Sequence, residues 1–249
     1  MIPTLLSSLV LLAGVPTMEH ARGERAGFVV AAPHEGFDEH TEPLARAVAE
    51  ALGWGWVVAR DFRATKERRW VDVNRPTQRV WEGSKRGPAR ETEDARRVYE
   101  VYQRRLIAAA GDRAAPLTLL VELHGHARTI EREDGERTRL QSIELATAGF
   151  SRGELRALKA RYERLVRELP PEDRVPLAVE QLDREYEVDG VQVRYYFRAS
   201  GAKQNGSLRP AAAQRALHFE LPQKVRFSEE RRARYAALLA ELLRPLAGD

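Results

Sequence analysis

The chain has 249 residues, 43% of them hydrophobic and 31% charged, a composition typical of a globular protein with room for one α/β domain. It contains no cysteine, which excludes a thiol nucleophile, a disulfide framework and a cysteine-based zinc site. The formal net charge is only +4 and basic residues alternate with acidic ones, so we expect no nucleic-acid partner.

Arginine heavily outnumbers lysine. A guanidinium group is planar and binds a carboxylate through two nitrogens, so this excess suits a small anionic substrate. Codon bias in a GC-rich genome explains the same excess, and composition alone does not separate the two interpretations.

The beginning of the chain has its own pattern. Residues 2–15 form an apolar run of signal-peptide length that lacks a basic start, and Met18 offers an alternative start codon. We expect residues 1–20 to be a cleaved export signal or a mis-assigned start, with a membrane anchor as the third alternative. The protein would be periplasmic or secreted with a real signal and cytoplasmic otherwise, and we expect no stable membrane span.

The first half of the remaining chain alternates apolar strands with amphipathic helices. Residues 28–32 form an apolar run that stops at a proline, and residues 54–59 form the next predicted strand. Helical spacing predicts helices over 41–52 and 91–110. Residues 117–123 are the clearest buried strand, and this strand leads directly into a histidine pair.

The second half continues the same alternation. The periodicity predicts a helix over 151–169, a strand over 215–221 and a closing helix over 228–243, which begins with a serine cap. Two Asp-Gly pairs, at 134–135 and 189–190, are typical of hairpin turns.

No repeat, linker or change in composition divides residues 25–249. We therefore expect one α/β domain, built on a mixed, mostly parallel sheet with helices on both faces.

Polar residues follow the predicted strands, where ligands bind in open α/β sheets. His34 and His124 each follow an apolar strand, and Glu220 lies near the end of another. Asp38 lies just before the 41–52 helix, where a short loop can bring it back to His34. Two imidazoles and a carboxylate would leave the fourth position of a zinc ion open for water. The alternative is that Asp38 is only an acid at the start of a helix.

Four short motifs carry a family resemblance. They are Ala-Pro-His-Glu-Gly at 32–36, Arg-Arg-Trp-Val-Asp-Val-Asn-Arg-Pro at 68–76, Glu-Leu-His-Gly at 122–125 and Ala-Leu-His-Phe-Glu-Leu at 216–221. In this order, and over most of the chain from Gly27 on, they resemble the N-formylglutamate amidohydrolase family, whose fold is similar to that of the zinc carboxypeptidases. The Asp-x-Asn-Arg-Pro stretch is the most specific of the four.

The resemblance implies a zinc-dependent hydrolase that cleaves an amide bond of an N-acyl amino acid or a peptide bearing a carboxylate. His34 and His124 would bind Zn²⁺, with Asp38 or, as the second choice, Glu35 as the carboxylate ligand. Zinc lowers the pKa of water and polarises the scissile carbonyl, which suits this residue set.

The other matched residues imply roles in binding and proton transfer. Asn74 and Arg75 match the pair that binds the substrate carboxylate, and Arg68 is a second candidate cation, with a catalytic role. Glu220 matches the general base that takes a proton from water. The alternative for the arginines is a solvated basic surface.

Three departures leave the substrate open. Glu35 stands where the family has a small residue, and His126 follows His124 closely enough that either could be the ligand. Residues 221–224 also lack the Asn-Arg that the family shows after Glu220. A peptide or another N-acyl amino acid therefore remains an alternative substrate. A binding protein that keeps the fold and the anion pocket without catalysis is the alternative from another functional class.

Overall fold

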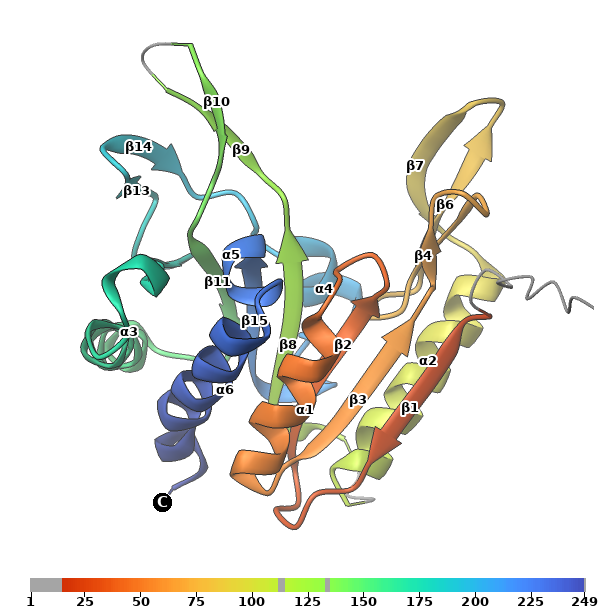
Figure 1. The fold of residues 1–249 in the computed structure, drawn as a ribbon. Coiled ribbons are helices and arrows are strands. Elements are labelled where there is room, and N and C mark those ends of the chain that lie inside the picture. Colours follow the sequence, from red (N-terminus) through yellow and green to blue (C-terminus); the bar gives the residue numbers. More distant parts are fainter. Residues whose placement is uncertain (1–14, 112–114, 133–134, 249) are drawn as a thin grey trace, which may run out of the picture.

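The structure of the protein is a computed structural model that describes residues 15–111, 115–132 and 135–248. At its centre lies a seven-stranded sheet in which four of the six strand pairings are parallel (Figure 1). In spatial order its strands are β1 (Thr17–Ala21), β3 (Gly55–Arg60), β2 (Phe28–Glu35), β8 (Leu117–His126), β15 (Ala213–Pro222), β11 (Ile143–Ala148) and β12 (Leu177–Val179).

Helices cover both faces of this sheet. The first face carries a core in which Leu44, Leu158 and Leu239 pack against the sheet from α1 (Thr41–Leu52), α3 (Arg152–Arg167) and α6 (Glu229–Leu243). The second face is covered by α2 (Glu93–Ala109) and the short α4 (Ser200–Asn205), through Leu106 and Ala202. The shorter helical segments are α5 (Gln223–Arg226), η1 (Pro171–Asp173) and η2 (Arg244–Ala247). The expected mixed, mostly parallel α/β architecture with helices on both faces is confirmed.

Local sequence signals explain several helix ends. Gly53 follows α1 in the left-handed conformation, with φ of 65°, and its N–H bonds to carbonyls of the last turn. Ser151 and Glu154 form a capping box at the start of α3, and Ser228 caps α6 by accepting the N–H of Arg231. These contacts confirm the predicted end of the first helix and the predicted serine cap.

Three smaller β-elements project beyond the carboxyl edge of the parallel strands (Figure 1). The largest consists of β4 (Arg63–Ala64), β5 (Arg69–Asp72), β6 (Thr77–Glu82) and β7 (Lys85–Glu91), and the two hairpins are β9 (Thr129–Glu131) with β10 (Arg137–Arg139), and β13 (Glu185–Val188) with β14 (Val191–Arg194). The predicted turn at Asp189-Gly190 joins β13 to β14, and both residues have positive φ, as this kind of turn requires. Asp134 of the other predicted turn lies outside the described residues.

Two strands run further than their apolar residues predict. β2 continues through Pro33 and His34 to Glu35, and β8 continues through His124 to His126. The pairing of β2 with β3 becomes irregular between Ala32 and Glu35, because proline has no N–H to donate to the ladder. The histidines therefore lie within the last residues of the strands and not in the loops after them.

The first part of the chain is only partly described. Most of the residues assigned to a leader, 1–14, lie outside the described residues, whereas Thr17–Ala21 forms β1 at one edge of the sheet. The central sheet thus includes residues that precede residue 25, where the sequence predicts the catalytic domain to begin. Among the residues described, no helix is long and apolar enough to cross a membrane.

Candidate metal centre and active site

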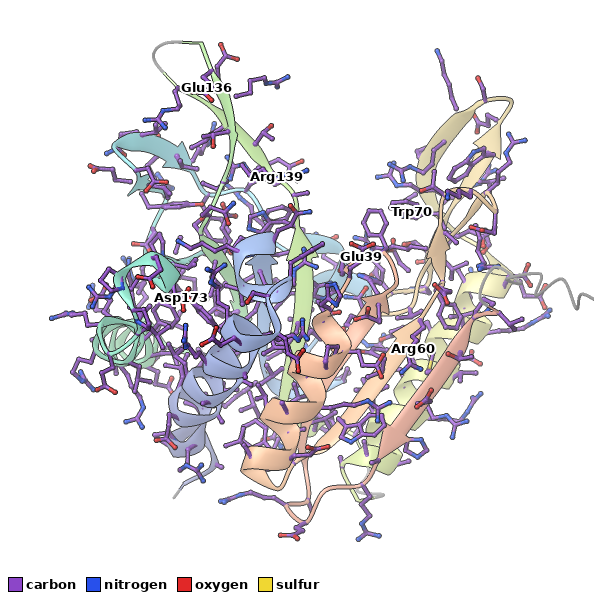
Figure 2. All side chains as sticks on the ribbon, in the orientation of Figure 1. Glu39, Arg60, Trp70, Glu136, Arg139 and Asp173 are labelled. Carbon is purple, nitrogen blue, oxygen red and sulfur yellow. The ribbon has the colours of Figure 1, made fainter. Side chains whose placement is uncertain are left out.

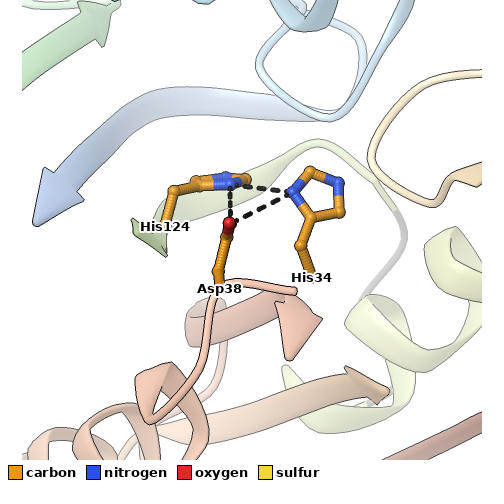
Figure 3. A group of neighbouring side chains, drawn as sticks. All are labelled: His34, Asp38 and His124. Atoms are coloured by element: carbon orange, nitrogen blue, oxygen red, sulfur yellow. Dashed lines mark hydrogen bonds and ion pairs between the residues drawn. The ribbon is translucent and has the colours of Figure 1, made fainter. Parts of the chain in front are cut away.

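Two histidines and an aspartate converge at the carboxyl edge of the sheet. His34 lies one residue before the end of β2 and His124 two residues before the end of the neighbouring β8, and their Nδ1 atoms lie 3.0 Å apart (Figure 3). A tight turn, in which the Asp38 N–H donates to the His34 carbonyl, brings Asp38 back over the strand end. Its Oδ2 lies 3.5 Å from Nδ1 of His34 and 3.4 Å from Nδ1 of His124.

These three distances suit one bound metal ion. Donor atoms at about 2.0–2.1 Å from a tetrahedral ion are separated by about 3.3–3.4 Å, close to the three separations observed. Two imidazoles and one carboxylate are also a donor set that catalytic zinc sites use. All three side chains are buried, so a metal ion bound by them would lie away from bulk water except on the side of the cavity.

The protonation states of the three side chains differ. Burial, with a further contribution from the positive charge of Arg63, lowers the pKa of His34 to about 3. Burial also opposes protonation of His124, but hydrogen bonds to Asp38 and Glu122 prevail and raise its pKa to about 9. Burial works against the Asp38 carboxylate as well, yet the two histidines hold its pKa well below its usual range. Asp38 and His34 are thus ready to act as ligands, whereas His124 must first release a proton.

Glu122 fixes the orientation of His124 from within the sheet. It is fully buried, and its Oε2 lies 3.4 Å from Nε2 of His124 and 3.4 Å from Nδ1 of His218. Nδ2 of Asn74 donates to the same oxygen at 3.0 Å, while the other oxygen accepts two hydroxyl groups. An acceptor at Nε2 of His124 leaves its Nδ1 free for a metal, and carboxylates commonly orient metal-binding histidines in this way. Glu122, His124 and His218 are near enough to form a cation site of their own, but Glu122 is already saturated by these donors.

Asp72 lies in the corresponding place behind His34. Its Oδ1 is 3.8 Å from Nε2 of His34, which is longer than a hydrogen bond, and this nitrogen is buried without a hydrogen-bond partner among the described residues. Asp72 instead binds Arg63, Arg75 and the hydroxyl group of Thr77. Burial works to raise the pKa of Asp72, but the charge of Arg63 and the other cations around it hold that pKa well below its usual range.

A cavity of about 550 Å³ opens in front of the three converging donors. Glu220 lines it from β15, in register with His124 on β8, and its Oε1 lies 3.2 Å from Nε2 of His218. The neighbouring apolar residues of β15, Leu217 and Phe219 among them, pack into the core on the other face of the sheet. This confirms the alternation that the sequence of the strand predicts, with Glu220 on the side of the cavity.

Both predicted substrate-binding residues, Asn74 and Arg75, line this cavity, but the predicted catalytic arginine, Arg68, does not. Arg68 occupies the exposed turn between β4 and β5, with φ of 52°, and donates to the carbonyl of Gly83 in the β6–β7 hairpin. The structure brings Arg63 to the cavity instead, because β4 starts at that residue beside Asp72. Sequence reasoning missed Arg63, which belongs to none of the motifs.

The two alternative ligands have other partners. The carboxylate of Glu35 accepts the backbone N–H groups of His40 and Glu42 and the hydroxyl group of Thr41, so it caps the start of α1. Nε2 of His126 lies 2.8 Å from the carbonyl oxygen of Ser142. Neither residue belongs to the converging group, which contains Asp38 and His124.

Comparisons with known proteins add a likeness of fold. No protein-family model and no curated protein matches the sequence. A solved gene product of Agrobacterium tumefaciens is similar at 15% identity and a TM-score of 0.49, over 93% of this chain and 94% of that one. The zinc-free form of YNDL is similar at 11% identity and a TM-score of 0.47, over 91% and 89%. A bacteriophage poly-gamma-glutamate hydrolase is similar at 11% identity and a TM-score of 0.43, over 95% and 90%. Membership of the N-formylglutamate amidohydrolase family is not confirmed by these comparisons.

Proposed function

We propose that the protein is a zinc-dependent hydrolase that cleaves an amide bond of an N-acyl amino acid or a peptide bearing a carboxylate. The observation that carries the proposal is the triangle of Nδ1 of His34, Nδ1 of His124 and Oδ2 of Asp38, with sides of 3.0, 3.5 and 3.4 Å, at the floor of a cavity. Zinc held there would polarise the scissile carbonyl and lower the pKa of water.

Glu220 is the general base in this proposal. It is the carboxylate that lines the cavity next to His124 without being one of the three converging donors. Its Oε atoms would take the proton of the attacking water and pass it to the leaving amine. The imidazole of His218, 3.2 Å from Oε1, holds the carboxylate in place.

The cationic part of the cavity would bind the carboxylate of the substrate. Arg75 lines the cavity and is held by Asp72 through two of its nitrogens, Nε at 2.9 Å and Nη2 at 2.8 Å. This leaves Nη1 for a ligand, with Asn74 and Arg63 beside it in the cavity lining. A carboxylate fixed in this way would orient the amide bond before reaction, which is a large part of catalysis in such sites.

The test is metal analysis combined with hydrolysis of a panel of N-acyl amino acids and short peptides. We expect stoichiometric zinc, activity that a chelator removes and added zinc restores, and loss of both metal and activity in His34→Ala. His126→Gln is the matched control, since this histidine lies two residues beyond His124 on the same strand and outside the converging donors. Activity that persists in the metal-free protein would refute the proposal, and bound zinc without hydrolysis of any panel member would favour a binding protein.

A further inference from the structure

One wall of the cavity is a segment that none of the sequence motifs includes. Residues 196–202 supply seven of the lining residues. Glu144 on β11 is fully buried, and its Oε2 accepts the backbone N–H groups of Tyr196 and Phe197 at 2.8 and 2.7 Å. Its other oxygen accepts two side-chain hydrogen bonds. The segment is therefore tied to the central sheet by a buried carboxylate whose hydrogen bonds are satisfied.

This anchored segment carries Arg198, which differs from the other arginines of the cavity. Arg63 and Arg75 are both paired with Asp72. The guanidinium group of Arg198 is exposed and, in the part of the chain that the structure describes, makes neither an ion pair nor a hydrogen bond. An unpaired guanidinium fork on a cavity wall is available to a carboxylate of a ligand.

Arg198 also lines a second, neighbouring cavity of about 280 Å³. Arg184 lines this smaller cavity too, and its guanidinium group likewise has no ion-pair partner among the residues described. The carboxylate of Glu180 in the same lining is neutralised by its ion pair with Lys203. Two unpaired arginines thus line a space that shares Arg198 with the larger cavity.

We propose that Arg198 and Arg184 form a second carboxylate subsite, separate from the carboxylate anchor at Arg75. The proposal rests on the proposed function and names its substrate class, acidic peptides that carry at least one side-chain carboxylate besides the carboxylate bound at Arg75. The two cavities, of about 550 and 280 Å³, give room for such a ligand, which is larger than one acylated amino acid.

The experiment compares two N-acetylated dipeptides, N-acetyl-Glu-Glu and N-acetyl-Gln-Gln. Both carry a free C-terminal carboxylate, and they differ only in side-chain charge. The glutamate peptide is tested in its α-linked and its γ-linked form. The zinc-loaded wild-type protein should prefer the glutamate peptide through a lower KM. Arg198→Gln should raise KM for the glutamate peptide about tenfold and leave the glutamine peptide unchanged, because only the former offers the second carboxylate. Arg184→Gln should act in the same direction with a smaller effect.

Arg194→Gln is the matched control, an exposed arginine on β14 that lines neither cavity. It should keep the preference of the wild type. An Arg198→Gln variant that retains the preference, or that loses activity on both peptides equally, would overturn the subsite. If the wild type hydrolyses neither these peptides nor any member of the panel, the proposed function fails, and calorimetric binding of the same pair decides the subsite by itself. Equal affinities for the two peptides would then overturn it, and a glutamate preference that Arg198→Gln removes would support it.

Discussion

One carboxylate oxygen of Asp72 contacts two nitrogens of Arg75, Nε at 2.9 Å and Nη2 at 2.8 Å. The guanidinium plane is therefore fixed before any ligand arrives, and Nη1 is the nitrogen that remains. Gly201, the second residue of α4, lies directly beside Nη1, and a Cβ at this position would overlap it. The absence of a side chain at residue 201 thus keeps the proposed carboxylate anchor open.

Gly201→Ala should consequently weaken substrate binding without unfolding the protein. The new methyl group must displace Nη1 of Arg75, and we expect KM for carboxylate-bearing substrates to rise about tenfold with kcat changed much less. Gly153→Ala is the matched control, because Gly153 is also the second residue of a helix and has free space around it. Steady-state kinetics and thermal unfolding of both variants check the prediction, and an unchanged KM for Gly201→Ala would contradict it.

Arg75→Lys and Arg68→Lys should differ in their effects. Lysine keeps the charge of Arg75 but cannot contact Asp72 through two nitrogens and still offer a third, so we expect KM to rise roughly 10- to 100-fold. The same change at Arg68, which is exposed and bonded to the Gly83 carbonyl, should leave kcat and KM within about twofold of the wild type. A similar rise in KM in both variants would show that Arg68 also takes part in substrate binding.

Glu122→Gln should lower metal affinity. The amide that replaces the carboxylate no longer provides a charged acceptor at Nε2 of His124, and changes of this kind weaken metal binding about 10- to 100-fold. Zinc affinity measured by competition with a chelator is the readout, together with circular dichroism, because Glu122 is fully buried. A folded variant with wild-type zinc affinity would show that Glu122 stabilises the buried hydrogen-bond network and does not influence metal binding.

The two converging histidines could be predicted because each follows an apolar run of a strand. His34 and His124 follow apolar runs that pair as neighbouring parallel strands, which brings equivalent positions together. The alternation along β15 likewise separates Glu220 from the core residues. The short-range pattern of the chain therefore suffices for the four central strands β3, β2, β8 and β15, the main helices and the two histidines, whereas β1, β11 and β12 were not predicted.

Other parts depend on contacts that no local pattern reveals. Glu144 meets the backbone of Tyr196 across a separation of 52 residues, and only the folded chain shows that this contact forms a cavity wall. Arg63 lines the cavity and Arg68 does not, because Arg68 lies in the turn between β4 and β5, where it adopts a positive φ. β2 also continues to Glu35 through irregular pairing at Pro33, although the apolar run that predicts the strand stops at Ala32.

A prediction about stability concerns Asp173, which lies between α3 and α6 (Figure 2). It binds Arg231 and Arg234 of α6, and these bonds, led by that of Arg231, lower its pKa below the usual value. A lowered folded-state pKa stabilises the protein above the unfolded-state pKa of about 3.9 and loses this effect as pH falls through the folded value. Asp173→Asn should therefore lower Tm by about 3–6 °C near pH 7, and the difference from wild type should shrink below about pH 4.

The control for Asp173 is Glu230→Gln. Glu230 also pairs with Arg234, but its side chain is 76% exposed, so its loss should change Tm by less than about 1 °C. Thermal unfolding of the two variants between pH 3 and 7 separates a buried from an exposed partner of the same arginine. A Tm difference for Asp173→Asn that is constant over this pH range would show that its charge is not the cause.

The last prediction concerns Glu220, which separates catalysis from binding in the proposed function. Its carboxylate lines the cavity beside His124 but is not among the three converging donors, so Glu220→Gln should keep the shape of the site and its zinc. Removal of a general base costs about 100-fold or more in kcat, and we expect at least this loss with KM changed little. Zinc content and single-turnover kinetics on the best substrate of the panel check both parts. Loss of zinc together with activity would make Glu220 a ligand and contradict the assignment of Asp38, because a site with a fourth protein ligand would have no open position for water. Full retention of activity and zinc would show that Glu220 is not the general base, and the proton of the attacking water would have to pass to another group of the cavity.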